Sequence, residues 1–355
     1  MKTFHQLVAN TLVASVTNNF LWFALTFWVY LETRSVMATA IIGGGYMLLL
    51  AVSGMFFGTF VDRHLRKTSM LLSNALSLIA FLAGGAVYAL APAGSLQDLG
   101  HIAFWALVTS VLAGAIAGNL RSVALATTVT LLVPEDERDK ANGLVGTVNG
   151  VGFAITSVFS GLAIGMLGMG ACLVIAIVLT AVAAVHLLTI SIAETAPEPK
   201  AEDPTYIDVA GALRAVRIVP GLMALLLFST FNNFLGGVFM ALMDPYGLSL
   251  MSVEAWGVML GVTSLGFILG GIVIARRGLG TNPVRTLLLA NVALWSITIL
   301  FPLRSEIAPL AIGFFLYMAL APVAEASEQT IVQKVVPYAE QGRVFGFAQS
   351  LETAA

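Results

Sequence analysis

Long apolar runs separated by short polar segments dominate the chain. An α-helix rises about 1.5 Å per residue and needs roughly 20 residues to cross about 30 Å of hydrocarbon. Ten runs meet that length, and we expect spanning helices near residues 8–31, 36–60, 67–91, 101–133, 141–165, 168–192, 219–243, 253–276, 284–303 and 307–334. An eleventh run starts near Gly342 and reaches Ala355 after roughly 14 residues. We therefore expect ten full helices, part of an eleventh, and a truncated second half.

The composition supports an integral membrane protein. Of 355 residues, 58% are hydrophobic and 10% are charged, whereas a soluble domain has about 25% charged residues. Because the backbone must satisfy its own hydrogen bonds in lipid, repeated apolar runs predict an all-α polytopic protein.

Charge and residue types exclude several function classes. The net charge of −2 and the scattered bases argue against nucleic-acid binding. The single cysteine, Cys172, lies in an apolar run without metal-ligand spacing. No Ser-His-Asp set and no Gly-rich phosphate loop is recognisable. We expect no metal, no cofactor and no enzymatic activity.

Lysine and arginine predict the orientation. If the N-terminus is inside, the outside links carry only Arg34 and Arg304, and nearly all other bases fall inside. By the positive-inside rule, this asymmetry predicts a multi-pass protein of the cell (inner) membrane with a cytoplasmic N-terminus.

The longest polar segment divides the chain into two parts. Residues 193–218 contain three prolines and mixed charge, which is typical of a linker. Its last part, from residue 207, predicts a short amphipathic helix on the cytoplasmic surface. The predicted units are a six-helix bundle at 1–192, the linker at 193–218, and an incomplete bundle at 219–355.

Three local patterns recur in the same order in the two parts. They are the Asn-Asn pairs within 17–21 and 231–235, Gly-x-x-x-Asp-Arg at 58–63 against Gly-x-x-x-Ala-Arg at 271–276, and Val-Pro at 133–134 and 336–337. Such repeats suit a transporter whose binding site lies between two halves.

The first copy of the glycine pattern opens a charged segment between two apolar runs. Gly58 permits close approach of a neighbouring helix. Asp62 is placed to accept hydrogen bonds from a helix N-terminus or to pair with an arginine. Arg63, Arg66 and Lys67 hold the segment on the cytoplasmic side. An ordinary basic loop that only sets topology would explain the bases, but not the glycine and the acid.

The spacing Gly-x-x-x-Asp-Arg-x-x-Arg-Lys resembles the signature between helices 2 and 3 of the major facilitator superfamily. The segments 28–35, 133–135 and 141–143 resemble its macrolide-exporter-like branch of drug and siderophore exporters. The fifth helix lacks a proline among its glycines and so departs from the antiporter signature, which puts proton antiport in question.

The resemblance implies a secondary active transporter with two six-helix repeats. We expect it to export a small amphipathic molecule across the cytoplasmic membrane by alternating access. The expected partners are the small-molecule substrate, the lipid bilayer and, as a candidate, a coupling proton. We expect a monomer. An inactive fragment or non-transporting membrane protein is the alternative, because the sequence stops within the expected eleventh helix; a membrane enzyme ranks below both.

Four amides lie well inside apolar helices: Asn18, Asn19, Asn232 and Asn233. They could bind substrate or join helices by hydrogen bonds, and the two readings carry equal weight. The resemblance places helices 1, 4, 7 and 10 around the cavity. Adjacent helical residues point about 100° apart, so one asparagine of each pair should face inward and the other should join helices.

Charges within the apolar runs form the last candidate set. Arg121 lies in the fourth helix, while Glu325, Glu328 and Gln329 share one face of the tenth. A charge at a helix centre costs roughly 2.5–3.5 kcal/mol on insertion scales. Aligning the two Val-Pro repeats places Arg121 beside Glu325. We expect Arg121 to meet one of the acids directly or through substrate; the alternative is that each charge pairs within its own half.

Overall fold

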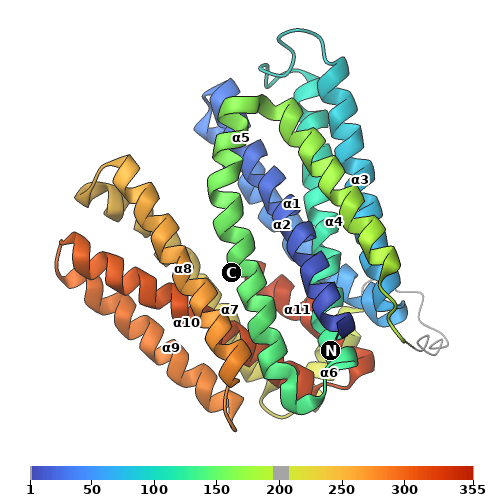
Figure 1. The fold of residues 1–355 in the computed structure, drawn as a ribbon, viewed down its shortest axis with the longest axis vertical. Helices are drawn as coiled ribbons and strands as arrows, with labels where there is room; N and C mark the ends of the chain where they lie inside the picture. The colour runs from blue at the N-terminus through green and yellow to red at the C-terminus, as the bar shows by residue number, and fades with distance from the viewer. Residues whose placement is uncertain (1, 195–207, 355) are drawn as a thin grey trace.

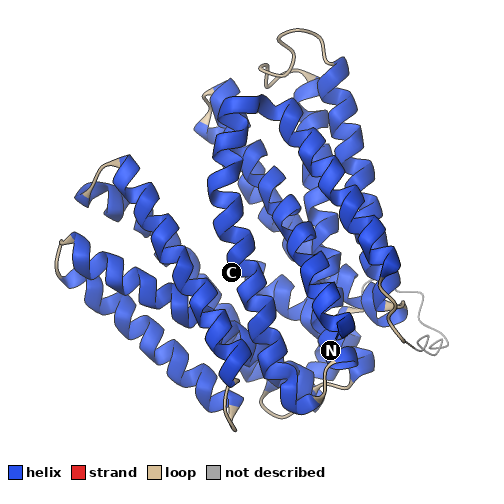
Figure 2. Ribbon diagram, in the orientation of Figure 1, coloured by secondary structure: helices blue, strands red, loops and turns tan. Residues whose placement is uncertain are grey.

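The computed structural model describes residues 2–194 and 208–354, and every regular element among them is a helix (Figures 1 and 2). The all-α fold predicted from the apolar runs is confirmed. Nine helices of the described part are long and apolar enough to cross a membrane. Together they form two groups that converge at one end of the molecule (Figure 1).

The first group consists of five helices, of which the last is bent. They are α1 (Lys2–Thr33), α2 (Val36–Arg63), α3 (Arg66–Leu90), α4 (Ile102–Leu132) and α5 (Arg138–Thr189). The helices predicted at 141–165 and 168–192 are the two arms of α5. They join at Gly168, whose φ of 76° is a conformation that only glycine adopts readily.

The second group begins with the helix in the last part of the predicted linker. It consists of α6 (Val209–Ile218), α7 (Leu222–Leu250), α8 (Val253–Arg277), α9 (Pro283–Leu300), α10 (Ile307–Val335) and α11 (Gln341–Ala354). The short 3₁₀ segments Glu135–Glu137, Phe301–Leu303 and Tyr338–Glu340 lie between helices.

The linker helix α6 lies where the sequence predicts a short amphipathic helix. Asp208 caps it by accepting a hydrogen bond from Gly211 N at 2.7 Å. Ala212 and Val216 are buried on one face and pack in the same cluster as Leu222 of α7. Residues 195–207 of the predicted linker lie outside the described part of the chain.

The charged segment around Asp62 is more helical than the sequence suggested. We expected α2 to end near residue 60, but it continues to Arg63, and only His64 and Leu65 separate it from α3. The motif residues from Gly58 to Arg63 therefore form the last turns of α2. The reason is that the segment contains no proline and its only glycine, Gly58, is packed against another helix.

The Val-Pro repeat marks the same corner in both halves. Val133 ends α4 and Val336 ends α10, each with an extended backbone. Pro134 and Pro337 then begin a 3₁₀ turn that leads into α5 and α11. A residue before proline avoids the α-helical region, which explains why both helices end there.

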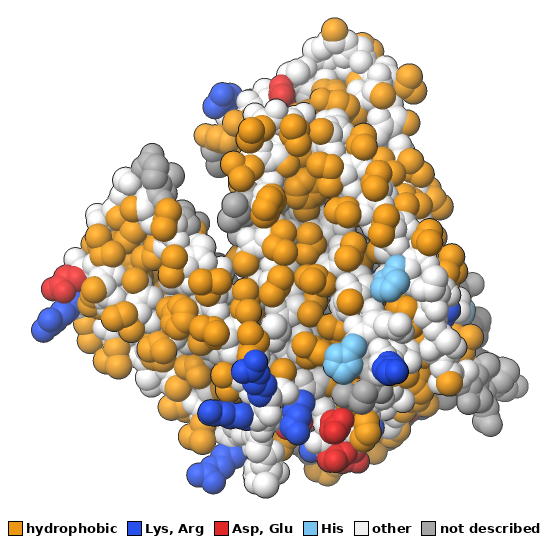
Figure 3. Space-filling model, in the orientation of Figure 1, with side chains coloured by type: hydrophobic (Ala, Val, Ile, Leu, Met, Phe, Trp, Pro, Cys, Tyr) orange, Lys and Arg blue, Asp and Glu red, His pale blue; other side chains and the backbone are white. Residues whose placement is uncertain are grey.

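Basic side chains gather at the end where the two groups meet, and a notch separates the groups at the opposite end (Figure 3). We call the first end the basic end. It holds the start of α1 and the turns α2–α3, α4–α5, α8–α9 and α10–α11. The opposite end, which holds the turns α1–α2, α3–α4, α7–α8 and α9–α10, is the open end.

Glycines allow the two groups to touch near the basic end. A Cβ atom on Gly143 of α5 would lie 2.6 Å from Ala275 N and 2.7 Å from Ile274 Cβ of α8. Gly271 of α8 packs in the same way against Thr147 of α5. Small residues of this kind let helix backbones approach closely in a membrane.

We predict that Gly143→Ala destabilises the protein while Gly146→Ala does not. The Gly143 methyl would collide with backbone, and overpacking costs about 1–3 kcal/mol. The methyl at Gly146 would meet only Pro322 Cβ at 3.6 Å, an ordinary contact. Both substitutions remove a helical glycine, so Gly146→Ala controls for the roughly 1 kcal/mol gain in helix propensity. Thermal unfolding in detergent measures the difference; equal midpoints for the two variants would contradict the close α5–α8 contact.

Candidate functional site

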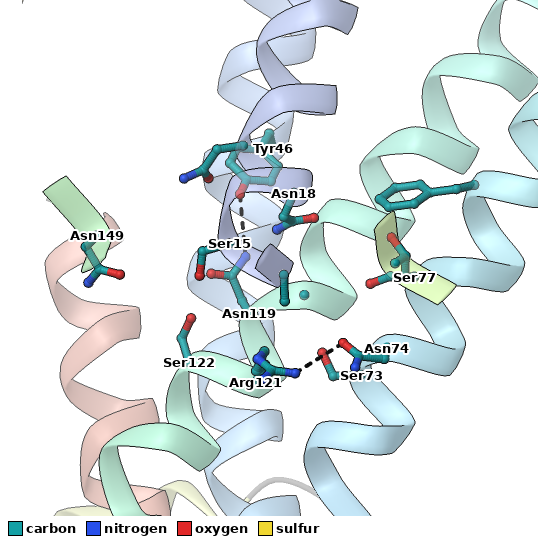
Figure 4. Close-up of a pocket in the computed structure, with 15 residues that line it drawn as sticks. Ser15, Asn18, Tyr46, Ser73, Asn74, Ser77, Asn119, Arg121, Ser122 and Asn149 are labelled. Carbon is teal, nitrogen blue, oxygen red and sulfur yellow. Dashed lines mark hydrogen bonds between the residues drawn. The ribbon is translucent and has the colours of Figure 1, made fainter. Parts of the chain in front are cut away.

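A polar cavity of about 170 Å³ lies within the first group of helices. Figure 4 shows side chains from several helices converging on it. Its polar lining includes Ser15, Asn18, Asn19, Asn74, Asn119 and Arg121. Carboxamides, hydroxyls and one guanidinium make this cavity rich in hydrogen-bonding groups, in a chain whose surface is largely apolar.

Arg121 is the charged residue of the cavity, and its side chain turns toward its own half. Only 3% of the residue is exposed. Its Nη2 donates to Asn10 Oδ1 and, at 3.3 Å, to Thr11 Oγ1 of α1; its Nη1 donates to Asn74 Oδ1 of α3 at 3.4 Å. Among the described residues, no ion pair includes Arg121. The direct pairing with Glu325 or Glu328 that we expected is therefore not found in this conformation.

The contacts of Arg121 extend to α5 through Asn10. Asn10 Nδ2 donates to Ala183 O at 2.8 Å and lies 3.0 Å from His186 Nδ1. Asn10 is itself 1% exposed. One buried amide thus connects the arginine of α4 to the second arm of α5, which fixes where the guanidinium lies.

The first asparagine pair only partly follows the prediction. Asn18 and Asn19 both line the cavity, so the expectation that only one of them faces inward is wrong. Asn18 also joins helices, because its Nδ2 donates to Ala115 O of α4 at 2.9 Å. Its amide packs directly on Gly118, where a Cβ atom would lie 2.8 Å from Asn18 Cγ. Because Gly118 has no side chain, the Asn18 amide can bind the backbone of α4 and line the cavity at the same time.

The second asparagine pair follows the prediction in part. Asn232 joins helices, since its Oδ1 accepts a hydrogen bond from Trp295 Nε1 of α9 at 2.6 Å. Asn233 is exposed, and its Nδ2 donates within α7, to Ser229 O at 3.1 Å. Neither lines the cavity of the first group.

The polar residues of α10 lie in three different environments. Gln329 lines a smaller cavity of about 70 Å³ together with Ser15 and Asn149 from the first group. Glu325 is exposed. Glu328 hydrogen-bonds through its side chain to Ser229 of α7 and to Glu352 of α11. Among the described residues, no group of three or more His, Cys, Asp or Glu side chains is arranged to hold a metal ion.

At the basic end, Asp62 binds the N-terminus of α11. Its Oδ1 accepts from Gly342 N at 2.7 Å, and its Oδ2 accepts from Arg343 N at 2.9 Å and Arg343 Nε at 3.1 Å. Gly58, one turn earlier, packs against the backbone of Gly342. The prediction that the carboxylate accepts hydrogen bonds from a helix N-terminus, or pairs with an arginine, is confirmed on both counts.

The neighbouring bases of the motif hold different partners. Arg66 is buried, lies 3.7 Å from Asp62 and 3.6 Å from Glu194, and covers the ring of Tyr338 at 4.3 Å. Burial raises the pKa of the Tyr338 hydroxyl, which donates to Glu194 Oε1 at 3.1 Å.

The other two bases lie further out. Lys67 Nζ donates to Leu188 O and Ile190 O at the end of α5, at 3.1 and 2.6 Å. Arg63 is exposed.

A second set of contacts at the basic end is made of neutral amides. Asn142 of α5 donates to Thr330 Oγ1 and Gln333 Oε1 of α10, each at 2.8 Å. Gln333 Nε2 donates in turn to Ala126 O of α4 at 2.9 Å. Asn142 belongs to the segment 141–143, which resembles an exporter branch of the family. Through Asn142 this segment joins the two groups of helices.

Sequence reasoning missed the contribution of α3 to the cavity. Ser73 Oγ and Ser77 Oγ donate to Ala117 O and Gly114 O of α4, each at 2.7 Å, and Asn74 lies beside them. The signal was present, because Ser69, Ser73 and Ser77 recur every four residues on one face of a helix. A stripe of hydroxyls in an apolar run marks the side that faces other helices.

Comparison with known proteins agrees with this architecture. Macrolide efflux protein A of Streptococcus pyogenes is 23% identical over 371 residues, covering 99% of this chain and 86% of the relative. A bacterial homologue of the iron transporter ferroportin, solved in an outward-facing state, superposes with a TM-score of 0.78 at 15% identity, covering all of this chain and 90% of that one. The proton:xylose symporter XylE superposes with a TM-score of 0.70 at 13% identity, covering 99% of this chain and 86% of that one. The family description "Major Facilitator Superfamily" matches residues 7–355. The chain is therefore a member of the major facilitator superfamily of transporters, and not an enzyme.

Proposed function

We propose that this protein exports a small amphipathic molecule across the cell membrane by alternating access. The observation that carries the proposal is that the two groups of helices touch at the basic end and part at the open end (Figure 3). A polar cavity lies within the first group, and a smaller one is lined by residues of both groups. Similarity to macrolide efflux protein A supports export rather than uptake.

The positive-inside rule assigns the basic end to the cytoplasm. With that orientation the N-terminus is cytoplasmic, and the conformation described is closed to the cytoplasm and open outward. The outward-facing state of the ferroportin homologue, which superposes well, supports this assignment. Alternating access then requires the contacts at the basic end to break so that substrate can enter from the cytoplasm.

Asp62 is our proposed conformational switch. Its hydrogen bonds join α2 of one group to α11 of the other, so they exist only while the basic end is closed. A residue shifts an equilibrium only through contacts that differ between the two states. Gly58 allows the close approach, and Arg63, Arg66 and Lys67 complete the switch segment.

Transport by purified protein in vesicles tests the function. A macrolide and amphipathic dyes serve as probes, with and without a pH gradient. We expect at least one probe to accumulate on the side of the vesicle membrane that corresponds to the outside of the cell. Collapse of the driving ion gradient should stop this accumulation. A proton is the first coupling ion to test. If no probe moves under any gradient, the exporter proposal fails.

We predict that Asp62→Asn lowers the transport rate by about tenfold or more. The amide keeps one acceptor oxygen but turns an NH₂ group toward Arg343, and a hydrogen bond to a charged group contributes about 1.5–3 kcal/mol. The control is Asp98→Asn, because Asp98 is an exposed loop carboxylate that accepts a hydrogen bond from Gly100 N. Both variants should insert to the same level. Transport by Asp62→Asn at the rate of the control would remove the switch role.

A further inference from the structure

We propose that Arg121 receives an acidic group of the transported molecule, so that the substrates are small amphipathic organic acids. This inference rests on the proposed function and names the substrate class. It starts from the charge balance of the cavity in the first group of helices.

Arg121 is a buried cation without a counter-charge. It is 3% exposed, and its three hydrogen-bond partners, Asn10, Thr11 and Asn74, are neutral. The ion pairs of the described residues all lie at the basic end, between Arg66 or Arg343 and nearby acids. A buried charge that lacks a partner is costly, so its retention in the cavity wall indicates that a mobile anion supplies the missing charge.

Unused hydrogen-bonding atoms converge on the same cavity. Arg121 Nε and Asn74 Nδ2 are buried donors without a partner among the described residues. Asn18 Oδ1 is a buried acceptor that also lacks a partner among the described residues. All three residues line the cavity. Buried polar groups in folded proteins are nearly always paired, so these atoms mark a place where a ligand or water completes the bonding.

The two donors suit a carboxylate. A guanidinium presents its N–H groups in a plane and binds two oxygens of one acid side by side. Asn74 already holds Nη1 of Arg121 through its Oδ1, at 3.4 Å, so its own Nδ2 is held close to the guanidinium. The remaining acceptor on Asn18 then pairs with a hydroxyl, an amide N–H or a water beside the acid.

The rest of the cavity offers contacts for an apolar or aromatic body. Phe81 and Tyr46 both line it. Tyr46 stacks on Trp22 with ring centroids 4.3 Å apart. Figure 4 shows Asn119 between Tyr46 and Arg121. A cavity of about 170 Å³ is more than ten times the roughly 10–15 Å³ that one water occupies by the same measure. A ring with one acidic substituent fits these dimensions and this polarity.

Three aromatic probes of similar size differ in charge: benzoate, its isosteric neutral amide benzamide, and the cation benzylamine. Each is titrated into the purified protein, and the thermal unfolding midpoint gives its dissociation constant. We expect benzoate to bind about tenfold or more tightly than benzamide, and benzylamine to bind weakest, because the guanidinium favours one sign of charge. Equal binding of the three, or tighter binding of benzylamine, would overturn the proposal.

Inorganic sulfate and phosphate are titrated into the protein in a second experiment. The organic-acid assignment requires that they bind more weakly than benzoate, because they make no contact with the aromatic wall. If sulfate binds as tightly as benzoate and displaces it, the cavity is a general anion site and the substrate class is wrong.

Variants test whether the preference for benzoate over benzamide depends on Arg121. We expect Arg121→Gln to bind benzoate and benzamide equally, Arg121→Lys to keep part of the preference, and Asn74→Ala to weaken benzoate more than benzamide. Arg304→Gln, at an exposed arginine of the open end, is the matched control and should behave as the unsubstituted protein. Loss of all three probes together in Arg121→Gln would indicate that Arg121 only maintains the fold, and would contradict the inference.

Transport distinguishes this inference from the function on which it rests. If neutral or cationic probes are exported and acids are not, the protein is an exporter and the organic-acid inference falls. If benzoate binds through Arg121 but no compound is transported, the assignment of the cavity stands and the exporter proposal falls.

Discussion

Contact between a carboxylate and a helix N-terminus holds the closed end of the molecule together. The first N–H groups of α11 have no partner within their own helix, and the N-terminus of a helix carries partial positive charge. Asp62 supplies oxygens to two of these N–H groups while it is almost completely buried. The carboxylate belongs to α2 and the N–H groups to α11, so neither group of helices satisfies its polar atoms alone at this point. The closed arrangement of the basic end follows from that mutual requirement.

The helices and their repeat could be predicted from the sequence because their signals are local. Apolar run length gives each spanning helix, and α4 was expected at 101–133 and is found at Ile102–Leu132. The Val-Pro pair ends a helix through steric restriction of a single residue, so the same corner recurs in both halves. The contact of Asp62 was predictable because a buried acid beside a turn has few ways to be satisfied.

The surroundings of Arg121 could not be predicted because they depend on which helix faces meet. Aligning the two repeats along the sequence placed Arg121 beside Glu325, but the tilt and rotation of α4 turn the side chain toward α1 and α3. Its main partner, Asn10, is one amide in an apolar run and carries no periodic signal. The close packing of Asn18 on Gly118 likewise needs the distance between two helices, which no single helix encodes.

The two sets of contacts at the basic end differ in their chemistry, and this difference has a mechanical meaning. Between α2 and α11 the contact is ionic, through Asp62 and Arg343. Between α5 and α10 it is made by the neutral amides of Asn142 and Gln333, together with a hydrogen bond from Arg138 Nη1 to Gln333 O at 3.0 Å. Coulombic attraction weakens with ionic strength and extends over several ångströms, whereas an amide hydrogen bond is short-ranged and insensitive to salt. As the two halves separate, the Asn142–Gln333 hydrogen bonds break at a shorter distance than the attraction between Asp62 and Arg343. The edge formed by α2 and α11 is therefore the last part of the basic end to separate.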